Sequence, residues 1–227
     1  MGKKKISLNN PLFVNLISTM IGIIAGLYIT SYFQENKLYD AKEKALIQVK
    51  QELHDNYSML KDFHQKVEEK YEPIAIIASA LDANMNLVIP KDSLQVFREQ
   101  TSIIFDYASF TAVDDTLIQL HGDFNVFIES PLMAKKLSSL VWNSYKQTDF
   151  LSITSFKCIT DVEAFYVLQK EANAIKETWK DQLFQMSFAR SAKSTEDFVN
   201  NWRVLLLKQK LLLDYYQSID AVLNNCE

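Results

Sequence analysis

The chain has 227 residues, 48% of them hydrophobic, and a formal net charge of −4 at pH 7. That apolar content is ample for one folded domain. The lysines are dispersed and only three arginines occur, whereas nucleic-acid binding requires clustered basic side chains that face phosphates. We therefore expect no nucleic-acid partner.

Residues 11–33 form the first predicted element, a transmembrane helix. They read PLFVNLISTMIGIIAGLYITSYF and include no charged side chain. As a helix they extend about 34 Å, enough to cross a hydrocarbon core of about 30 Å. A cleavable signal peptide would have a shorter apolar region and small residues at a cleavage position, which this segment lacks. We therefore expect an uncleaved anchor in a lipid bilayer.

The orientation of the span is predicted from the basic tail at residues 1–10. This tail carries Lys3, Lys4 and Lys5. A short basic segment before a first span favours a cytoplasmic N-terminus, because long soluble segments translocate largely regardless of charge. We expect a single-pass protein of the bacterial inner (cytoplasmic) membrane, with most of the chain outside the cytoplasm.

Small residues recur every four positions along the span. They are Ser18, Gly22, Gly26 and Thr30. Such a row lies along one face of a helix and allows a second helix to approach closely. The alternative explanation is that glycine is common in spans in general. We predict that this face packs against another span, either in a homo-oligomer or with another membrane protein.

A juxtamembrane amphipathic helix is predicted over residues 34–72. No glycine or proline occurs between Gly26 and Pro73, so the span can continue into this helix, and Pro73 should break or kink it. Its apolar residues fall near a seven-residue repeat, which is typical of helices that pair with other helices. We expect this stripe to be an interaction surface. It consists of Leu46, Val49, Leu53, Leu60, Phe63 and Val67.

Residues 73–227 are predicted to form a helical bundle that packs with residues 34–72. Residues 74–81 should form a short helix, and after Pro131 the chain contains neither proline nor glycine. The predicted fold class is all-α, an up-down bundle continuous with the anchor. Further helix starts are expected at Asp92 or Ser93 (reaching Tyr107), at Asp114–Asp115 (ending near Gly122), at Ser130–Pro131, at the capping box Thr160-x-x-Glu163 (reaching Ala189), and at Ser194.

No arrangement of side chains points to catalysis or to a cofactor. Nucleophile elbows, glycine-rich phosphate loops and zinc-ligand clusters do not occur in the sequence. His64 and Glu68 are one helical turn apart and could share a metal, but a solvated pair is the favoured interpretation. We expect no enzymatic activity, no metal and no cofactor.

The two cysteines, Cys158 and Cys226, are far apart and form no CxxC motif. A disulfide is compatible with a domain outside the cytoplasm, and spacing alone does not decide the matter. We favour a buried thiol at Cys158 and a separate thiol near the C-terminus.

Large aromatic side chains are dense in the second half of the chain. They are Trp142, Tyr145, Phe150, Phe156, Phe165, Tyr166 and Trp179. They could line an apolar pocket or groove. The favoured interpretation is that they are core residues at helical spacing.

Residues 110–124 read FTAVDDTLIQLHGDF, behind a basic tail, one span and a charged helix. This layout resembles uncharacterised bacterial families of small single-span membrane proteins, in which a similar segment is a short helix that ends at a glycine and a later helix carries a tyrosine, here Tyr145. The exit from the span differs, because Ser31–Asn36 stands in place of an Asn-Trp-Asn-like sequence. The resemblance implies an N-terminal anchor and an all-helical domain, and it implies no activity.

These features predict a membrane-anchored helical interaction or scaffold protein, a subunit of a homo-oligomer or of a larger membrane complex. The alternative is an extracytoplasmic sensor that binds a small apolar ligand among its aromatic side chains. The two functions differ in what should accompany the purified protein, namely a protein partner or a bound small molecule.

Overall fold

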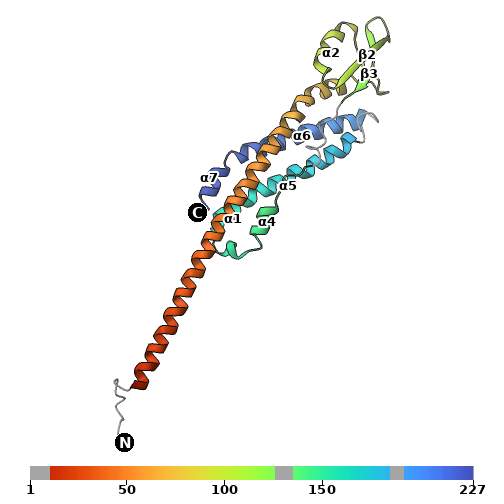
Figure 1. The fold of residues 1–227 in the computed structure, drawn as a ribbon. Helices are drawn as coiled ribbons and strands as arrows, with labels where there is room; N and C mark the ends of the chain where they lie inside the picture. The colour runs from red at the N-terminus through yellow and green to blue at the C-terminus, as the bar shows by residue number, and fades with distance from the viewer. Residues whose placement is uncertain (1–10, 126–134, 185–191, 227) are drawn as a thin grey trace.

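The computed structural model is elongated, with the N-terminus at one end and a small β-sheet at the other (Figure 1). It describes residues 11–125, 135–184 and 192–226. The elements in chain order are α1 (Pro11–Ser79), β1 (Val88–Pro90), η1 (Lys91–Ser93), α2 (Leu94–Thr101), β2 (Phe105–Ala112), β3 (Leu117–Phe124), α4 (Leu140–Tyr145), η2 (Asp149–Ile153), α5 (Phe156–Phe184), α6 (Ala192–Tyr216) and α7 (Ile219–Asn224).

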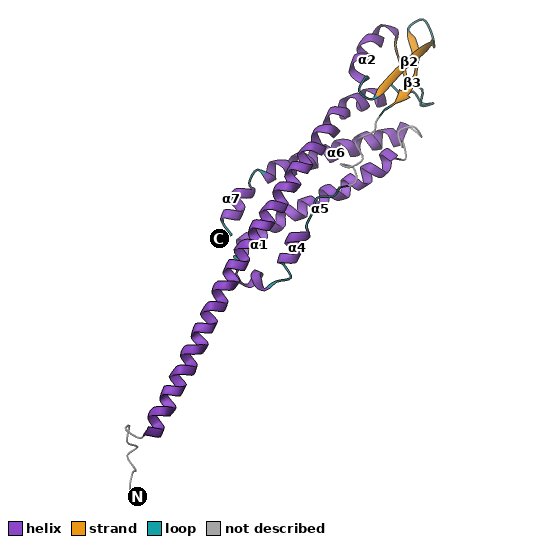
Figure 2. Ribbon diagram, viewed as in Figure 1, coloured by secondary structure: helices purple, strands orange, loops and turns teal. Residues whose placement is uncertain are grey.

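Most of the described chain is helical, but the all-α prediction is correct only in part. Strands β1, β3 and β2 form an antiparallel sheet in that order. Figure 2 shows this sheet, together with α2, at the end of the molecule farthest from the N-terminus. Below it, α6 packs against both α1 and α5 and forms the helical bundle.

Helix α1 runs without interruption from Pro11 to Ser79, so the predicted end at Pro73 and the separate helix at 74–81 are wrong. A proline inside a helix costs about 3 kcal/mol. Ile74 and Ile77 follow it and are buried in the core near the sheet. Burial of each of these side chains contributes about 1.5–3 kcal/mol, which offsets the local cost of the proline.

Two hydrophobic clusters follow one another along the bundle and divide its core. The tip-side cluster joins α1, α5 and α6 to the sheet and includes Phe63, Trp179, Phe198, Trp202 and Ile118. The span-side cluster joins α1 to α4, α5, α6 and α7 and includes Leu53, Trp142, Phe165, Tyr216 and Ile219. Helices α1, α5 and α6 each contribute side chains to both clusters and so connect them.

Residues 105–124 form a β-hairpin, which corrects the helix predicted from Asp114–Asp115 to Gly122. Asp114 Oδ1 accepts hydrogen bonds from the backbone N–H groups of Thr116 and Leu117, both at 2.7 Å. These hydrogen bonds also lower the pKa of the Asp114 carboxyl group. The aspartate therefore closes a turn, a role that short polar side chains fill as readily as the start of a helix.

Side-chain alternation explains why β3 is extended. Ile118 and Leu120 are buried in the tip-side cluster, and Gln119 between them is partly exposed. This period of two fits a strand with one buried face. At Gly122 a Cβ atom would lie 2.2 Å from the backbone oxygen of Asp106 on β2, so glycine permits the close approach of the two strands.

Two other predicted helix boundaries are displaced. Helix α2 ends at Thr101 and β2 begins at Phe105, so the helix expected to reach Tyr107 is shorter. Helix α5 begins at Phe156, and Thr160 lies inside it, where its hydroxyl donates to the backbone oxygen of Phe156 at 3.1 Å. A threonine inside a helix can return its hydroxyl to the preceding turn in this way, so it is not a reliable start signal.

Of the remaining predicted helix starts and ends, some differ from the structure and others lie outside the described residues. Ser93 precedes α2 but makes no side-chain capping hydrogen bond. Helix α6 begins at Ala192, so Ser194 lies within it. The predicted start at Ser130–Pro131 and the predicted helix end near Ala189 lie outside the described residues.

Candidate functional site

Among the described residues, α1 is the one helix long and apolar enough to cross a membrane. Its most apolar window has a mean hydropathy of 1.7, and none of that window is buried within the protein. Figure 1 shows this part of α1 projecting from the bundle with no other element beside it. A long apolar helix left bare in this way is compatible with a segment that crosses a membrane.

The four small residues of the span are exposed, and their packing stays a prediction. A Cβ added at Gly22 or Gly26 would meet nothing within 4 Å. Thr30 donates its hydroxyl to the backbone oxygen of Gly26 at 2.8 Å, so that polar group is satisfied within the helix. Together with exposed Ser18, these residues leave one face of α1 open to a second helix.

The juxtamembrane stripe lies inside the protein's own core. Each of its six side chains is at most 7% exposed. Phe63 and Val67 belong to the tip-side cluster, and Leu46, Val49, Leu53 and Leu60 belong to the span-side cluster. A partner therefore has no access to the stripe while the domain is folded, and the sequence pattern reflects packing against α4, α5 and α6.

A buried carboxylate, Glu52 on α1, holds the segment that leads into α4. Its Oε2 atom accepts hydrogen bonds from the hydroxyl of Ser138 at 2.6 Å and from the backbone N–H of Val141 at 3.0 Å. Its Oε1 atom accepts the hydroxyl of Tyr166 at 2.8 Å. Burial and the adjacent Glu52 charge raise the pKa of Tyr166.

Asn56, one turn further along α1, completes the same attachment. Its amide donates to the backbone oxygen of Ser138 and accepts from the Ser138 N–H, both at 2.8 Å. These contacts occupy the acceptors of Glu52 and the amide of Asn56, so the arrangement is suited to holding a chain segment rather than to proton transfer. The buried role of Glu52 was not predicted from the sequence.

Lys176 on α5 is the second buried charged group near the middle of the bundle. Its ammonium group donates to the backbone oxygen of Lys135 at 2.5 Å and lies 4.4 Å from the centre of the Phe63 ring. Burial lowers the pKa of Lys176 to about 8. The adjacent cavity, lined in part by Leu60 and Gln209, has a volume of about 20 Å³. It holds about one water molecule, so no small organic ligand fits beside this lysine.

The aromatic residues of the second half are mostly core residues, as favoured. Trp142, Tyr145, Phe165, Tyr166 and Trp179 are buried, and Phe150 is partly buried. Phe156 is the exception, with 81% of its surface exposed.

Of the pair His64 and Glu68, predicted as solvated, His64 is partly buried and Glu68 is exposed. His64 Nδ1 lies 3.1 Å from the side-chain oxygen of Gln209 on α6, and His64 Nε2 lies 3.9 Å from Glu68. No group of three or more potential metal ligands occurs among the described residues. Whether the protein binds a metal or catalyses a reaction stays at the level of the sequence expectation.

Cys158 and Cys226 form a disulfide, which corrects the expectation of two separate thiols. Both residues are buried in the span-side cluster. Lys42 on α1 donates its ammonium group to the backbone oxygen of Cys226 at 3.2 Å. The C-terminal end is thereby fixed both to the first turns of α5 and to α1. The sequence separation of 68 residues gave no local signal for this pairing.

The tip carries the exposed apolar groups that lie farthest from the span. Val113, in the turn between β2 and β3, is 54% exposed, and Phe110 on β2 is also exposed. Strand β2 is at the edge of the sheet, so its outer backbone groups face away from β3. A hollow of about 430 Å³ separates β2 from α2 and is lined by polar residues that include Arg98, Glu99 and Asp106.

Comparison with family models, with curated proteins and with solved structures finds no match to this chain.

Proposed function

We propose that this protein is a membrane-anchored scaffold of the bacterial inner membrane, with its N-terminus in the cytoplasm and its folded domain outside. It holds the sheet and α2 at a fixed distance from the bilayer, where they contact a partner protein. The main support for this proposal is the continuity of α1, because the same helix contains the apolar segment and runs through the length of the folded domain. From Phe33 to Ser79 that helix rises about 70 Å.

The disulfide supports the extracytoplasmic location. Disulfides persist in oxidising compartments and are rare in the cytosol, where thiols are kept reduced. Cys158 and Cys226 are both buried in the folded domain, where their bond joins distant parts of the chain. This observation points in the same direction as the basic tail at residues 1–10.

The surfaces of the domain favour a partner protein over a small ligand. The buried cavity beside Lys176 is too small for an organic molecule, whereas Val113 and Phe110 expose apolar groups at the tip. The span face of Gly22 and Gly26 leaves room for association within the bilayer, in a homo-oligomer or with another membrane protein.

Two measurements test the proposal. Protease added to intact spheroplasts should digest the domain, and complete protection until lysis would reverse the orientation. For the tip, a photo-crosslinking amino acid placed at Val113 should yield a discrete adduct in living cells. The matched control is Leu207 on α6, which is 59% exposed but lies on the side of the bundle. Equal labelling from both positions, or from neither, would contradict a partner at the tip.

A further inference from the structure

The underside of the folded domain begins close to the end of the apolar span. Leu38 is the first residue beyond Phe33 that the domain partly covers, and Lys42 is the first that it buries. These residues lie about 8 Å and 14 Å further along the helix than Phe33. A headgroup layer occupies about 5–8 Å on each side of the hydrocarbon core. The underside of the domain therefore lies just above, or at, the lipid headgroups.

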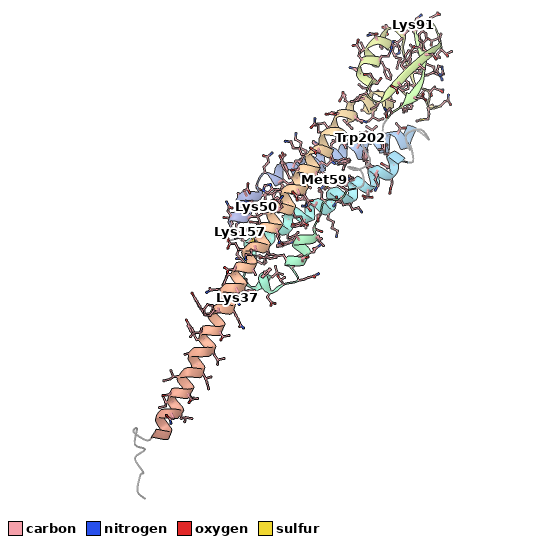
Figure 3. All side chains as sticks on the ribbon, viewed as in Figure 1. Lys37, Lys50, Met59, Lys91, Lys157 and Trp202 are labelled. Atoms are coloured by element: carbon pink, nitrogen blue, oxygen red, sulfur yellow. A yellow bond between two sulfur atoms is a disulfide. The ribbon has the colours of Figure 1, made fainter. Side chains whose placement is uncertain are left out.

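The first turn of α5 is part of this underside. Cys158 is bonded to Cys226, whose backbone oxygen contacts Lys42 on α1, so this turn lies near the level of Lys42. Further along α5, Trp179 packs against Phe63, so the helix runs away from the span. Figure 3 places Lys157 at the end of the domain that is nearer the span, between the levels of Lys50 and Lys37.

Phe156 is the first residue of α5 and has the largest exposed fraction of any large hydrophobic side chain described, 81%. It lies two residues before Cys158, which brings its backbone to about 10 Å above the level of Phe33. Because Cα–Cβ bonds tilt toward the N-terminus of a helix, its side chain leans toward the span end. A fully exposed aromatic ring is unfavourable in water and favourable at a membrane interface.

We infer that the first turn of α5 is a second membrane-contact site, in which the ring of Phe156 enters the headgroup region of the bilayer that α1 crosses. This inference rests on the proposed membrane anchor. Spans tilt by about 20° on average. Packed helices lie about 8–10 Å apart, so a tilt toward α5 lowers Phe156 by about a further 3 Å.

The contact is apolar rather than electrostatic. The neighbouring Lys157 is paired with Asp161 at 2.5 Å, so the turn offers no net cationic group for anionic lipid. Phe156 is therefore expected to contact the boundary between the headgroups and the acyl chains of a zwitterionic bilayer. Together with the span, this contact fixes both the tilt of the protein and the side toward which it tilts.

A tryptophan placed at Phe156 in the full-length chain tests the contact. The three native tryptophans are buried. The F156W variant is reconstituted in phosphatidylcholine liposomes, with and without a phosphatidylcholine that carries a nitroxide near the glycerol backbone. A ring at the interface lies within about 5–10 Å of the label, so the added fluorescence should fall about twofold. L207W, at a position that is also exposed (59%) but on the side of the bundle, serves as the control and should keep its intensity.

Each alternative outcome overturns the inference in a distinct way. Unchanged F156W fluorescence with a water-exposed emission maximum would show that the turn stands clear of the bilayer. A blue-shifted but unquenched emission would show a protein partner over Phe156 in place of lipid. Quenching of both variants would show that the whole side of the bundle lies on the membrane. Failure of the proposed anchor is seen separately, as release of the chain from the liposomes in alkaline carbonate.

Discussion

The two halves of the bundle are stabilised by different chemistry. In the tip-side half, apolar side chains from α1, α5, α6 and the sheet meet with few buried charges, and Trp202 contacts both Trp179 and Phe198 edge to face. In the span-side half, a disulfide and the hydrogen bonds of Glu52 and Asn56 tie together segments far apart in sequence. The span-side half is thus constrained by specific bonds and the tip-side half by burial. We expect the two halves to respond differently to substitution and to redox conditions.

The largest effect is expected from truncation of the tip-side core. Trp202 is fully buried and its indole N–H donates to the backbone oxygen of Val67 at 3.1 Å. Trp202→Ala should lower the free energy of unfolding by about 5 kcal/mol, near the upper end for such truncations. Urea denaturation measures this loss. Leu207→Ala on the exposed side of α6 is the control, and a comparable loss there would contradict the assignment of the core.

Loss of the disulfide should be the next largest effect, and it should begin in the span-side half. A closed loop of 68 residues corresponds to about 4 kcal/mol in the chain-entropy model. The double variant C158S/C226S should therefore lose about that much stability and become insensitive to dithiothreitol. Hydrogen exchange should increase first in α7 and the start of α5. Equal increases around Trp202 would show that the halves unfold as one unit.

Removal of the Glu52 carboxylate should have a somewhat smaller effect. Glu52→Ala leaves the Tyr166 hydroxyl and the Val141 N–H without their acceptor, which should cost about 3 kcal/mol. Glu52→Gln keeps one acceptor oxygen and should cost less. Thermal denaturation of both variants measures the difference. If alanine and glutamine were equivalent, the carboxylate would not be what holds the segment before α4.

Lys176, which lies against Phe63 of the tip-side cluster, should produce a pH effect. Its pKa of about 8 in the folded chain lies below the unfolded value of 10.5. The unfolded state therefore binds more protons between these values, so stability should rise with pH across pH 8–10.5, by roughly 2 kcal/mol after a reduction for partial solvent screening of the ammonium group. In the Lys176→Met variant this rise in the free energy of unfolding should be absent. An unchanged pH profile in the variant would contradict a depressed pKa.

The smallest effect concerns the span, where neither half of the domain is involved. Gly22→Leu combined with Gly26→Leu should weaken recovery of dimers or partner complexes in detergent, because bulky residues prevent close helix approach. Contacts between spans are modest, since even hydrogen-bonded pairs average about 0.6 kcal/mol, so the folded domain should be unaffected. Leucine at Ile21 and Ala25 is the control. Equal assembly of wild type and the glycine variant would leave the glycines as ordinary span composition.

The same difference between the halves explains what the sequence could predict. The apolar segment and the stripe from Leu46 to Val67 are periodic over long stretches, so a single long helix could be expected from them. The hairpin could not, because Asp114–Asp115 is equally compatible with a turn and with a helix start. The burial of Glu52 and the Cys158–Cys226 bond depend on segments that come together only in the folded protein. Local periodicity in the sequence does not report such long-range contacts.

Because α1 is uninterrupted, a tilt of its N-terminal part also moves the sheet at the opposite end of the protein. Nothing in the helix between Phe33 and Ser79 interrupts its hydrogen-bonded turns, apart from the proline near its end. With an arm of about 70 Å, a change of 10° in the inclination of the span sweeps the sheet sideways by about 12 Å. If α1 crosses a bilayer as proposed, a small event there, such as a change in its thickness or a second span docking on Gly22, would produce a displacement wide enough to engage or release another molecule at the far end.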